Sequence, residues 1–295
     1  MIKLTGRAPA KLNLFLDVTS KLDNGYHEID SVMQSVSLCD EIDLEINNGS
    51  GVEVSCDSPF APSGNDNIVW RAADRYMAAN KINASVKIDL KKKIPSPAGM
   101  GGGSADAAAV LRCLNGYYKA MDYNELVELA LGIGSDVPFC LKNGTQRVRG
   151  LGEKLKGTSR VPSKALFLIA VSGEDVSTPE AYKALDLKYD NFNDYRPICS
   201  PDPLINAINE FDINEICKGM YNVFEDVVLP LCPVASRSKN IILQNGAVGA
   251  MMSGSGSAVF GIFDDREKAI FAKRKLENVG VNAYLEAPCY DNTLC

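Results

Sequence analysis

The chain is poor in histidine, since its 295 residues include only one, His27. A single histidine excludes metal sites and catalytic relays that require two. Nine cysteines are present, but no two are spaced as Cys-x-x-Cys, the pair on which most cysteine zinc sites are built. An odd number of scattered cysteines is typical of reduced thiols in a reducing compartment, and we therefore expect a cytoplasmic protein.

Long hydrophobic runs and an excess of positive charge are also missing. The longest strongly apolar segment, residues 165–171, is far shorter than the ~20 residues that a membrane-spanning helix needs. Residues 1–18 alternate and carry charges, unlike the continuous apolar core of a signal peptide. A net charge of −6 is poorly suited to wrapping nucleic acid. We therefore expect neither a membrane nor nucleic acid as a partner.

The patterns that are present predict a mixed α+β protein in two parts, because 295 residues suggest roughly two domains of ~100–200 residues. A seam near residues 160–162 divides the chain into expected domains 1–160 and 161–295. Period-two alternation predicts half-buried strands, and spacings of three and four predict helices. The expected strands are 11–18, 35–46, 51–56, 86–90 and 165–171, and the expected helices are 68–79, 105–114 and 124–131. A long connection with short helices is expected over residues 174–203. Beyond it, the segments 241–244, 258–263 and 268–278 alternate in helix and strand character.

The most specific local feature is a glycine-rich loop that begins at Pro95, between an expected strand and an expected helix. Four glycines within residues 99–103 let the backbone curl closely around a ligand, because no Cβ intervenes. The next helix is expected to start at about Ser104, and its free N–H groups and dipole would then favour an anion in the loop. Ser104 would either cap this helix or place its hydroxyl on a phosphate or a magnesium ion. A flexible turn with an N-cap serine is the simpler alternative.

Two common phosphate-binding patterns do not fit this loop. GxGxxG fails because Ser104 stands at the last glycine, and GxxxxGK[ST] fails because no lysine follows Gly103. The order Pro-x-x-x-Gly-x-Gly-Gly-Gly-Ser after a strand instead resembles the phosphate loop of the GHMP kinases. This resemblance implies that ATP phosphates bind to the loop. The residues it assigns to them are Pro95, Ser96, Pro97, Ala98, Gly99, Met100, Gly101, Gly102, Gly103, Ser104 and Ala105.

Other segments resemble motifs of those GHMP kinases that act on a cytidine diphosphate-linked methylerythritol in the non-mevalonate isoprenoid pathway. They are APAKLNLFL at 8–16, DNGYH at 23–27, DNIV at 66–69, GSDVPF at 134–139 and SGSGSA at 253–258. Met100, Ala105 and Ser253 depart from the usual leucine, serine and threonine. The resemblance implies a two-domain GHMP kinase fold. Its N-terminal domain, which binds ATP and is catalytic, would be like domain 2 of ribosomal protein S5, and its C-terminal domain would be ferredoxin-like.

The implied reaction is ATP-dependent phosphorylation of the 2-hydroxyl of that small-molecule substrate, with Mg²⁺, by a monomer or homodimer. The attacking hydroxyl must lose a proton to a nearby base, which the resemblance assigns to Asp136; an N-cap or turn aspartate is the alternative. Lys11 and Asn13 point to one face of a period-two strand. The resemblance places Lys11 beside Asp136 and Asn13 at the substrate, whereas a lysine at a strand edge is the structural alternative.

The resemblance assigns recognition of the cytosine to Tyr26, His27, Thr178 and Tyr182. The two ring nitrogens of a histidine can address the edge of a base, and a tyrosine can stack on its face. A lone histidine is more often a packing residue, and that alternative stays open. Gly254 and Gly256 would form a small loop near the substrate diphosphate, or else a plain β-turn.

On the ATP side, the lysine triplet 91–93 leads into the glycine-rich loop, although such triplets are usually solvated. Lys92 aligns best with a contact to ATP, and Asn67 would bound the adenine pocket. Asp106 would favour the helix dipole or bind magnesium, and Ser104 is the expected magnesium ligand.

Two further functions remain compatible with the sequence. One is another GHMP kinase, acting on a small alcohol such as mevalonate or homoserine. The other is a sugar- or nucleotide-sensing module that keeps the fold without the chemistry. The presence of both Lys11 and Asp136 argues against the sensor.

Overall fold

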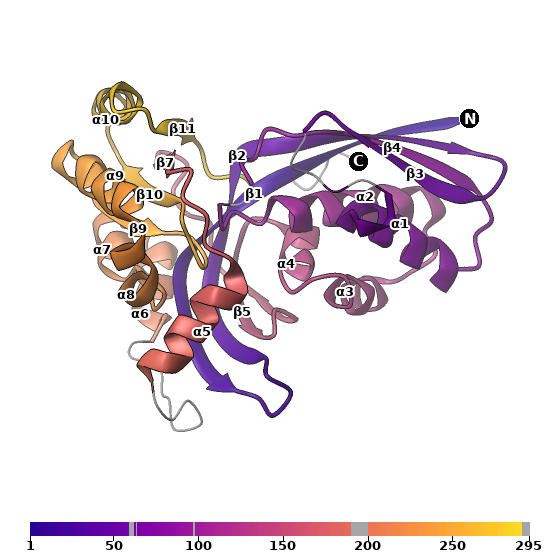
Figure 1. The fold of residues 1–295 in the computed structure, drawn as a ribbon, viewed down its shortest axis with the longest axis horizontal. Coiled ribbons are helices and arrows are strands. Elements are labelled where there is room, and N and C mark those ends of the chain that lie inside the picture. The colour runs from indigo at the N-terminus through magenta and orange to yellow at the C-terminus, as the bar shows by residue number, and fades with distance from the viewer. Residues whose placement is uncertain (59–61, 63, 97, 190–199, 291–295) are drawn as a thin grey trace.

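Two β-sheets with flanking helices organise the protein, and the computed structural model describes residues 1–58, 62, 64–96, 98–189 and 200–290 (Figure 1). The first sheet contains β1 (Ile2–Lys21), β2 (His27–Asn47), β3 (Gly51–Cys56), β4 (Ser85–Lys91), β5 (Thr145–Gly150), β6 (Lys154–Gly157) and β8 (Tyr221–Asn222). The second contains β7 (Leu166–Val171), β9 (Gly249–Met252), β10 (Val259–Phe263) and β11 (Asn282–Glu286). The helices are α1 (Ile68–Ala79), α2 (Gly102–Tyr118), α3 (Tyr123–Leu131), α4 (Val137–Lys142), α5 (Thr178–Lys188), α6 (Asp202–Asn209), α7 (Ile213–Lys218), α8 (Glu225–Val228), α9 (Pro233–Gln244) and α10 (Arg266–Asn278), with short 3₁₀ turns η1 (Gly64–Asp66) and η3 (Leu229–Leu231).

The first sheet is built around a long antiparallel hairpin of β1 and β2. Its strand order is β3-β4-β2-β1-β8, and β5 and β6 extend from β2. At the end of the hairpin, Lys21 pairs with His27 across a turn in which Gly25 has a φ of +83°. The register of β1 shifts between Asn13 and Phe15, and such bulges re-aim the neighbouring side chains. The hairpin therefore carries two segments toward the site, its irregular middle and its terminal turn.

β1 is more deeply buried than its alternating sequence predicts. Residues 8–18 are buried on both faces, including Lys11 at 4% exposed and Asn13 at 1%. The expectation of a half-buried strand is wrong here. Leu12 and Leu14, on one face of β1, join a core with residues of the second sheet. The other face, which carries Lys11 and Asn13, is buried as well. Burial of these polar side chains means that each requires a partner.

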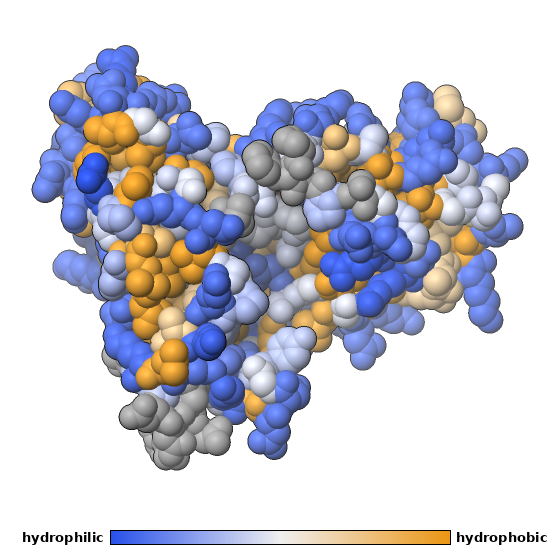
Figure 2. Space-filling view, viewed as in Figure 1, coloured by the Kyte–Doolittle hydropathy of each residue, from blue (hydrophilic) through white to orange (hydrophobic). Residues whose placement is uncertain are grey.

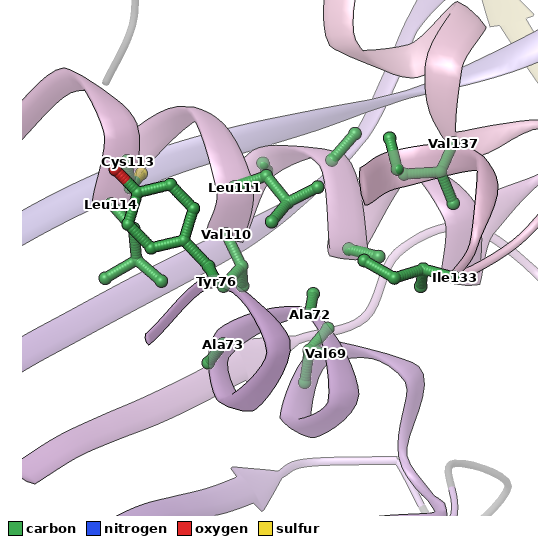
Figure 3. Close-up of a cluster of buried hydrophobic side chains, with 14 of the residues drawn as sticks. Val69, Ala72, Ala73, Tyr76, Val110, Leu111, Cys113, Leu114, Ile133 and Val137 are labelled. Atoms are coloured by element: carbon green, nitrogen blue, oxygen red, sulfur yellow. The ribbon is translucent and has the colours of Figure 1, made fainter. Parts of the chain in front are cut away.

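α1 and α2 pack against each other beside the first sheet, as Figure 3 shows. Val69 and Tyr76 of α1 face Val110 and Leu114 of α2, and all four are buried. α1 begins where the Asn67 side chain accepts a hydrogen bond from the N–H of Val69, which is a standard N-cap. The helices expected over 68–79, 105–114 and 124–131 are confirmed, although α2 begins three residues earlier and continues to Tyr118.

The second sheet has the order β11-β7-β10-β9, and all its pairs are antiparallel. Along the chain its elements follow as β7, α9, β9, β10, α10 and β11, which is the ferredoxin-like βαββαβ arrangement. One face packs on α9 and α10, for example through Leu168 against Leu276, and the other packs on α6 and α7. The α+β fold with a ferredoxin-like C-terminal part is therefore confirmed.

The two parts of the chain are interleaved. β8, from the C-terminal half, pairs in parallel with β1, and Pro288 forms a bridge with Val36 of β2. A division at residues 160 and 161 stays a prediction. The connection expected over 174–203 contains the whole of α5, and residues 190–199 of it lie outside the described part of the chain. None of the helices in the described ranges combines the length and the apolar run that crossing a membrane requires.

Candidate active site

A cavity of about 760 Å³ lies between the hairpin, the first turns of α2 and α4, and α5. Figure 2 shows the surface hollowed between the part over α5 and the part over α2 and α3. Of the residues expected in the site, those that line the cavity are Lys11, Asn13, Tyr26, His27, Pro95, Ser96, Ala98, Gly99, Met100, Gly101, Gly102, Gly103, Ser104, Asp136, Thr178, Tyr182 and Gly254. Those that do not line it are Asn67, Lys92, Ala105 and Gly256, and Pro97 lies outside the described residues.

Lys11 and Asp136 meet at the cavity wall. The Nζ of Lys11 lies 3.4 Å from Oδ2 of Asp136 and donates a hydrogen bond of 2.8 Å to Oδ1 of Asn13. Asp136 stands at the N-cap position of α4, but its side chain makes no capping hydrogen bond and is 30% exposed. The carboxylate therefore serves Lys11 and the cavity rather than the helix.

A chain of hydrogen bonds holds the Asn13 side chain in one orientation. Its Nδ2 donates to Oγ of Ser31 at 2.9 Å, and that hydroxyl donates to the carbonyl of Phe15 at 2.6 Å. Because the amide nitrogen is occupied in this way, Oδ1 is turned toward Lys11. The expectation that Lys11 and Asn13 share a face is confirmed, and the ammonium group is fixed between two oxygens.

The glycine-rich loop is shaped by close backbone contacts. Gly99 has a φ of +70°, and a Cβ on it would lie 2.5 Å from the carbonyl oxygen of Ser253. Gly101 has a φ of +68°, and a Cβ there would lie 3.0 Å from Cγ of Lys11. The N–H of Lys11 donates to the carbonyl of Met100 at 3.0 Å. Glycine is therefore required both for the left-handed backbone and for the approach to β1 and to the loop after β9.

We call residues 95, 96 and 98–104, which include the first turn of α2, the loop side of the cavity. The first N–H groups of a helix have no partner within the helix, and together with the dipole they favour an anion. Gly101 takes the N-cap position in a left-handed conformation, and no side chain caps the helix. The expectation that Ser104 caps α2 at its start is wrong, because the glycines themselves begin the helix. Ser104 lies in the first turn and lines the cavity instead.

Lys92 lies behind the loop side rather than in the cavity. Its Nζ pairs with Asp40 and, at 2.6 Å, with Asp106, and both carboxylates are buried. Burial raises the pKa of Asp106 to about 8, while the charge of Lys92 lowers it and that of Asp40 raises it. Burial lowers the pKa of Lys92, but the two carboxylates outweigh this and raise it. A charged Lys92 with a proton kept on Asp106 leaves this buried cluster neutral, which is how such groups avoid the cost of burial.

Three more expected site residues do not line the cavity and instead support the surrounding structure. Asn67 is 3% exposed, caps α1 through Oδ1, and donates from Nδ2 to the carbonyl of Pro62 at 2.8 Å. Ala105 is fully buried within α2. The carbonyl of Gly256 faces the position that a Cβ on Gly99 would occupy, at 2.9 Å. Gly256 thus supports the glycine-rich loop from behind.

The opposite wall joins the end of the hairpin to α5, and we call it the hairpin side. Nε2 of His27 lies 2.7 Å from Oδ1 of Asp186, whose other oxygen accepts from Nζ of Lys21 at 2.5 Å. The ring of His27 stacks on that of Tyr182, with centroids 4.7 Å apart and planes at 27°. Tyr182 in turn meets the ring of Phe224 edge-on. These contacts hold the single histidine in a defined plane.

Tyr26 and Thr178 of the hairpin side are nearer to solvent. Tyr26 is 61% exposed beside His27 and lines the cavity. The Oγ1 of Thr178 lies 3.0 Å from Oγ of Ser255, so α5 also contacts the loop after β9. Gly254 in that loop comes close to the glycine-rich loop and to Lys11, since a Cβ on it would lie 2.9 Å from the carbonyl oxygen of Gly99 and 3.4 Å from Nζ of Lys11.

Sequence reasoning missed Asp186 and Ser255. Asp186 follows Tyr182 by four residues, and Tyr182 follows Thr178 by four, so the three lie on one face of α5. Helical spacing from the two expected residues would have pointed to Asp186. Ser255 lies between two glycines that were themselves expected in the site.

Comparison with known families identifies both parts of the chain. The family described as GHMP kinases N terminal domain matches residues 67–144, and that described as GHMP kinases C terminal matches residues 204–282. A curated relative from Acetivibrio thermocellus, named 4-diphosphocytidyl-2-C-methyl-D-erythritol kinase, is 40% identical over 94% of this chain and 96% of its own length. One of the same name from Caldicellulosiruptor saccharolyticus is 43% identical over 92% of both chains.

Solved structures agree. A crystal structure of 4-(cytidine 5'-diphospho)-2C-methyl-D-erythritol kinase is 31% identical, with a TM-score of 0.79 over 97% of this chain and 99% of that one. Homoserine kinase from Cytophaga hutchinsonii has a TM-score of 0.76 over 98% of this chain and 95% of its own, at 19% identity. The second likeness concerns the fold alone.

Proposed function

Because the chain belongs to the GHMP kinases and, among them, to the family of 4-diphosphocytidyl-2-C-methyl-D-erythritol kinases, we propose that it phosphorylates the 2-hydroxyl of 4-diphosphocytidyl-2-C-methyl-D-erythritol with ATP. This reaction belongs to the non-mevalonate route to isoprenoid precursors. The observation that carries the proposal is the pair of Lys11 and Asp136, which lies in a cavity between the loop side and the hairpin side.

Asp136 acts as the base in this proposal. The hydroxyl that attacks the γ-phosphate must give up a proton, and a carboxylate within hydrogen-bond reach can accept it. Asp136 has a partly exposed carboxylate that no helix cap occupies. Lys11, fixed by Asn13, contributes a positive charge 3.4 Å from that carboxylate and stabilises both the ionised base and the charge on the transferred phosphoryl group.

The loop side binds the ATP phosphates. Backbone N–H groups at the start of α2 and the absence of Cβ atoms at Gly101, Gly102 and Gly103 provide a concave, positively polarised surface. Because Lys92 is paired with Asp40 and Asp106, its contribution is to hold the loop from behind. The phosphates are then held mainly by backbone groups.

Magnesium fits this site as an ion held largely by ATP. Mg²⁺ in phosphate-transfer sites keeps several waters and binds one or two protein oxygens together with substrate phosphates. Across the described ranges no three histidine, cysteine or carboxylate side chains gather to form a metal site. The hydroxyl of Ser104, which lines the cavity in the first turn of α2, is the protein oxygen that would hold the ion. Bound there, Mg²⁺ neutralises phosphate charge.

The hairpin side favours the cytidine substrate over a small alcohol. Mevalonate and homoserine have no aromatic base, whereas this wall offers two tyrosine rings and a histidine edge. Another GHMP kinase activity, on a mevalonate- or homoserine-type alcohol, is the second candidate, and the fold it requires is the same. The chemistry of the hairpin side supports the cytidine substrate.

Product analysis tests the proposal. The purified protein is incubated with ATP, Mg²⁺ and the cytidine substrate, and the product is examined by ³¹P nuclear magnetic resonance. We expect a new phosphomonoester signal in equal amount to the ADP formed, with coupling that places it on the tertiary 2-hydroxyl carbon rather than on a primary alcohol. ADP formation without that signal, or a phosphate at another hydroxyl, would contradict the proposal.

A further inference from the structure

The strongest feature outside the expected site residues is Asp186. Its side chain reaches from α5 to the end of the hairpin, and each oxygen has a separate partner there. Oδ1 meets Nε2 of His27 at 2.7 Å, and Oδ2 meets Nζ of Lys21 at 2.5 Å. These residues are far apart in sequence, so the contacts are a product of the fold and not of local chain geometry.

Asp186 remains an acceptor in this position. Burial raises the pKa of Asp186, but hydrogen bonds from Lys21 and His27 outweigh burial and lower it. An ionised carboxylate can only accept hydrogen bonds. Nε2 of His27 must therefore carry a proton and donate a hydrogen bond to Oδ1 of Asp186.

The imidazole ring of His27 cannot flip freely to exchange the positions of Nδ1 and Nε2. It is stacked on Tyr182, and its side chain is 7% exposed. Tyr182 is held in turn by the edge of Phe224. With the proton on Nε2, a neutral imidazole has its lone pair on Nδ1, which makes that nitrogen an acceptor.

We propose that Asp186 is a positioning residue for base recognition: it keeps the ring proton of His27 on Nε2, so that Nδ1 accepts a hydrogen bond from the exocyclic amino group of cytosine. The inference rests on the proposed function, because it takes a cytidine diphosphate unit as the ligand. Uracil has a carbonyl where cytosine has the amino group, and a carbonyl cannot donate to Nδ1. Asp186 thus selects cytidine over uridine through the histidine.

The single histidine makes a direct test practicable. Protein labelled with ¹⁵N-histidine gives one pair of ring nitrogen signals, and their shifts and couplings identify which nitrogen carries the proton. Without ligand, we expect Nε2 of the wild-type ring to carry the proton. A proton on Nδ1, alone or together with Nε2, would overturn the inference. This measurement needs no variant, so it stays decisive even if a substitution fails to fold.

Binding of CDP and UDP, measured by titration calorimetry, provides the second readout. Asp186→Asn should shift the ring toward a mixture of tautomers and weaken CDP about tenfold, the effect of losing about 1.4 kcal/mol of hydrogen bonding. UDP binding and the KM for ATP should change less than about twofold. Asp226→Asn is the matched control, because it breaks a 2.8 Å ion pair between Lys188 of α5 and α8 without contacting His27. It should change neither the ring signals nor the nucleotide preference.

The outcomes separate this inference from the proposed function. If Asp186→Asn keeps the full preference for CDP, the inference fails while the proposed function stands. If CDP and UDP bind equally to the wild-type protein, the inference fails; the proposed function fails only if no phosphorylated cytidine product is formed. Equal losses of CDP and ATP binding in Asp186→Asn would show a general structural role for Asp186 and overturn the inference alone.

Discussion

The loop side and the hairpin side of the cavity are made in different ways. The loop side is one contiguous segment, shaped by glycine and offering backbone N–H groups at the start of α2. On the hairpin side, side chains come together from segments that are 159 residues apart, as between His27 and Asp186. Backbone groups suit a phosphate, which is the same in every nucleoside triphosphate, whereas side chains are needed to tell one base from another.

The two sides meet at Lys11 and Asp136. Lys11 contacts the loop side through its backbone N–H and the carbonyl of Met100, and its side chain reaches Asp136. The comparison therefore predicts three separable classes of variant. A change at this junction of Lys11 and Asp136 should stop phosphoryl transfer. A change on the loop side should weaken the binding of ATP, and a change on the hairpin side should weaken the binding of the cytidine substrate.

The largest effect is expected at the junction. Asp136→Asn removes the proposed base but keeps the shape of the side chain, and turnover should fall by about 10²–10⁴. Binding of ATP and of CDP, measured by titration calorimetry, should be nearly unchanged because neither wall is altered. Turnover close to that of the wild-type enzyme would mean that another group takes the proton.

Gly99→Ala should separate the loop side from the hairpin side. The left-handed φ of +70° costs an alanine about 1–2 kcal/mol, and its Cβ would lie 2.5 Å from the carbonyl oxygen of Ser253. The loop must shift, and we expect the KM for ATP to rise about tenfold, equivalent to about 1.4 kcal/mol, with a lower free energy of unfolding.

Gly116→Ala is the matched control for that variant. Gly116 lies on the exposed face of α2, and nothing is within 4 Å of a Cβ placed on it. This change should leave both KM values unaltered and stabilise the protein by about 0.5–1 kcal/mol in denaturant titrations. A rise in the KM for ATP in the control, matching that of Gly99→Ala, would remove the special role of the loop.

His27→Ala should have the converse effect. Loss of a hydrogen bond and of a stacked ring is expected to raise the KM for the cytidine substrate about tenfold, while the KM for ATP stays within about twofold. Steady-state kinetics with each substrate varied in turn provide the measurement. If both KM values rise equally, His27 is a packing residue and the comparison between the two sides breaks down.

The smallest effect on turnover is expected behind the loop side. Because the folded-state pKa of Asp106 is raised to about 8 from 3.8, the folded protein keeps a proton that the unfolded chain releases. The stability this contributes is fully present below about pH 4 and is lost as the pH rises to about 8. Asp106→Asn, which imitates the neutral acid, should flatten this decline by at most about 1 kcal/mol per pH unit. If the free energy of unfolding fell equally with pH in the wild-type protein and in Asp106→Asn across this range, the raised pKa of Asp106 would be contradicted.

Much of the fold could be predicted from local signals. The segments 51–56 and 68–79 match β3 and α1 in full, because alternation and helical spacing are local properties. The burial of β1 on both faces was not predictable from alternation. Alternation alone places Lys11 and Asn13 on the polar face of a half-buried strand, and in the structure that face is buried, with Met100 of the loop side hydrogen-bonded to Lys11.

The same distinction holds for the site. The glycine-rich loop is visible in the sequence because its function resides in consecutive residues. The ion pairs of Lys92 with Asp40 and Asp106 are not visible in the sequence, since they depend on which buried side chains the fold brings together. Asp186 was missed for the same reason, although its spacing from Tyr182 was available. Contacts between distant segments need the structure.

We propose that this kinase uses the hairpin side to choose a cytidine-linked alcohol. ADP release with saturating ATP, measured for the cytidine substrate and, separately, for mevalonate and homoserine, tests it most directly. We predict rapid release with the cytidine substrate and none above background with the two small alcohols. Release with mevalonate or homoserine, and none with the cytidine substrate, would contradict the account.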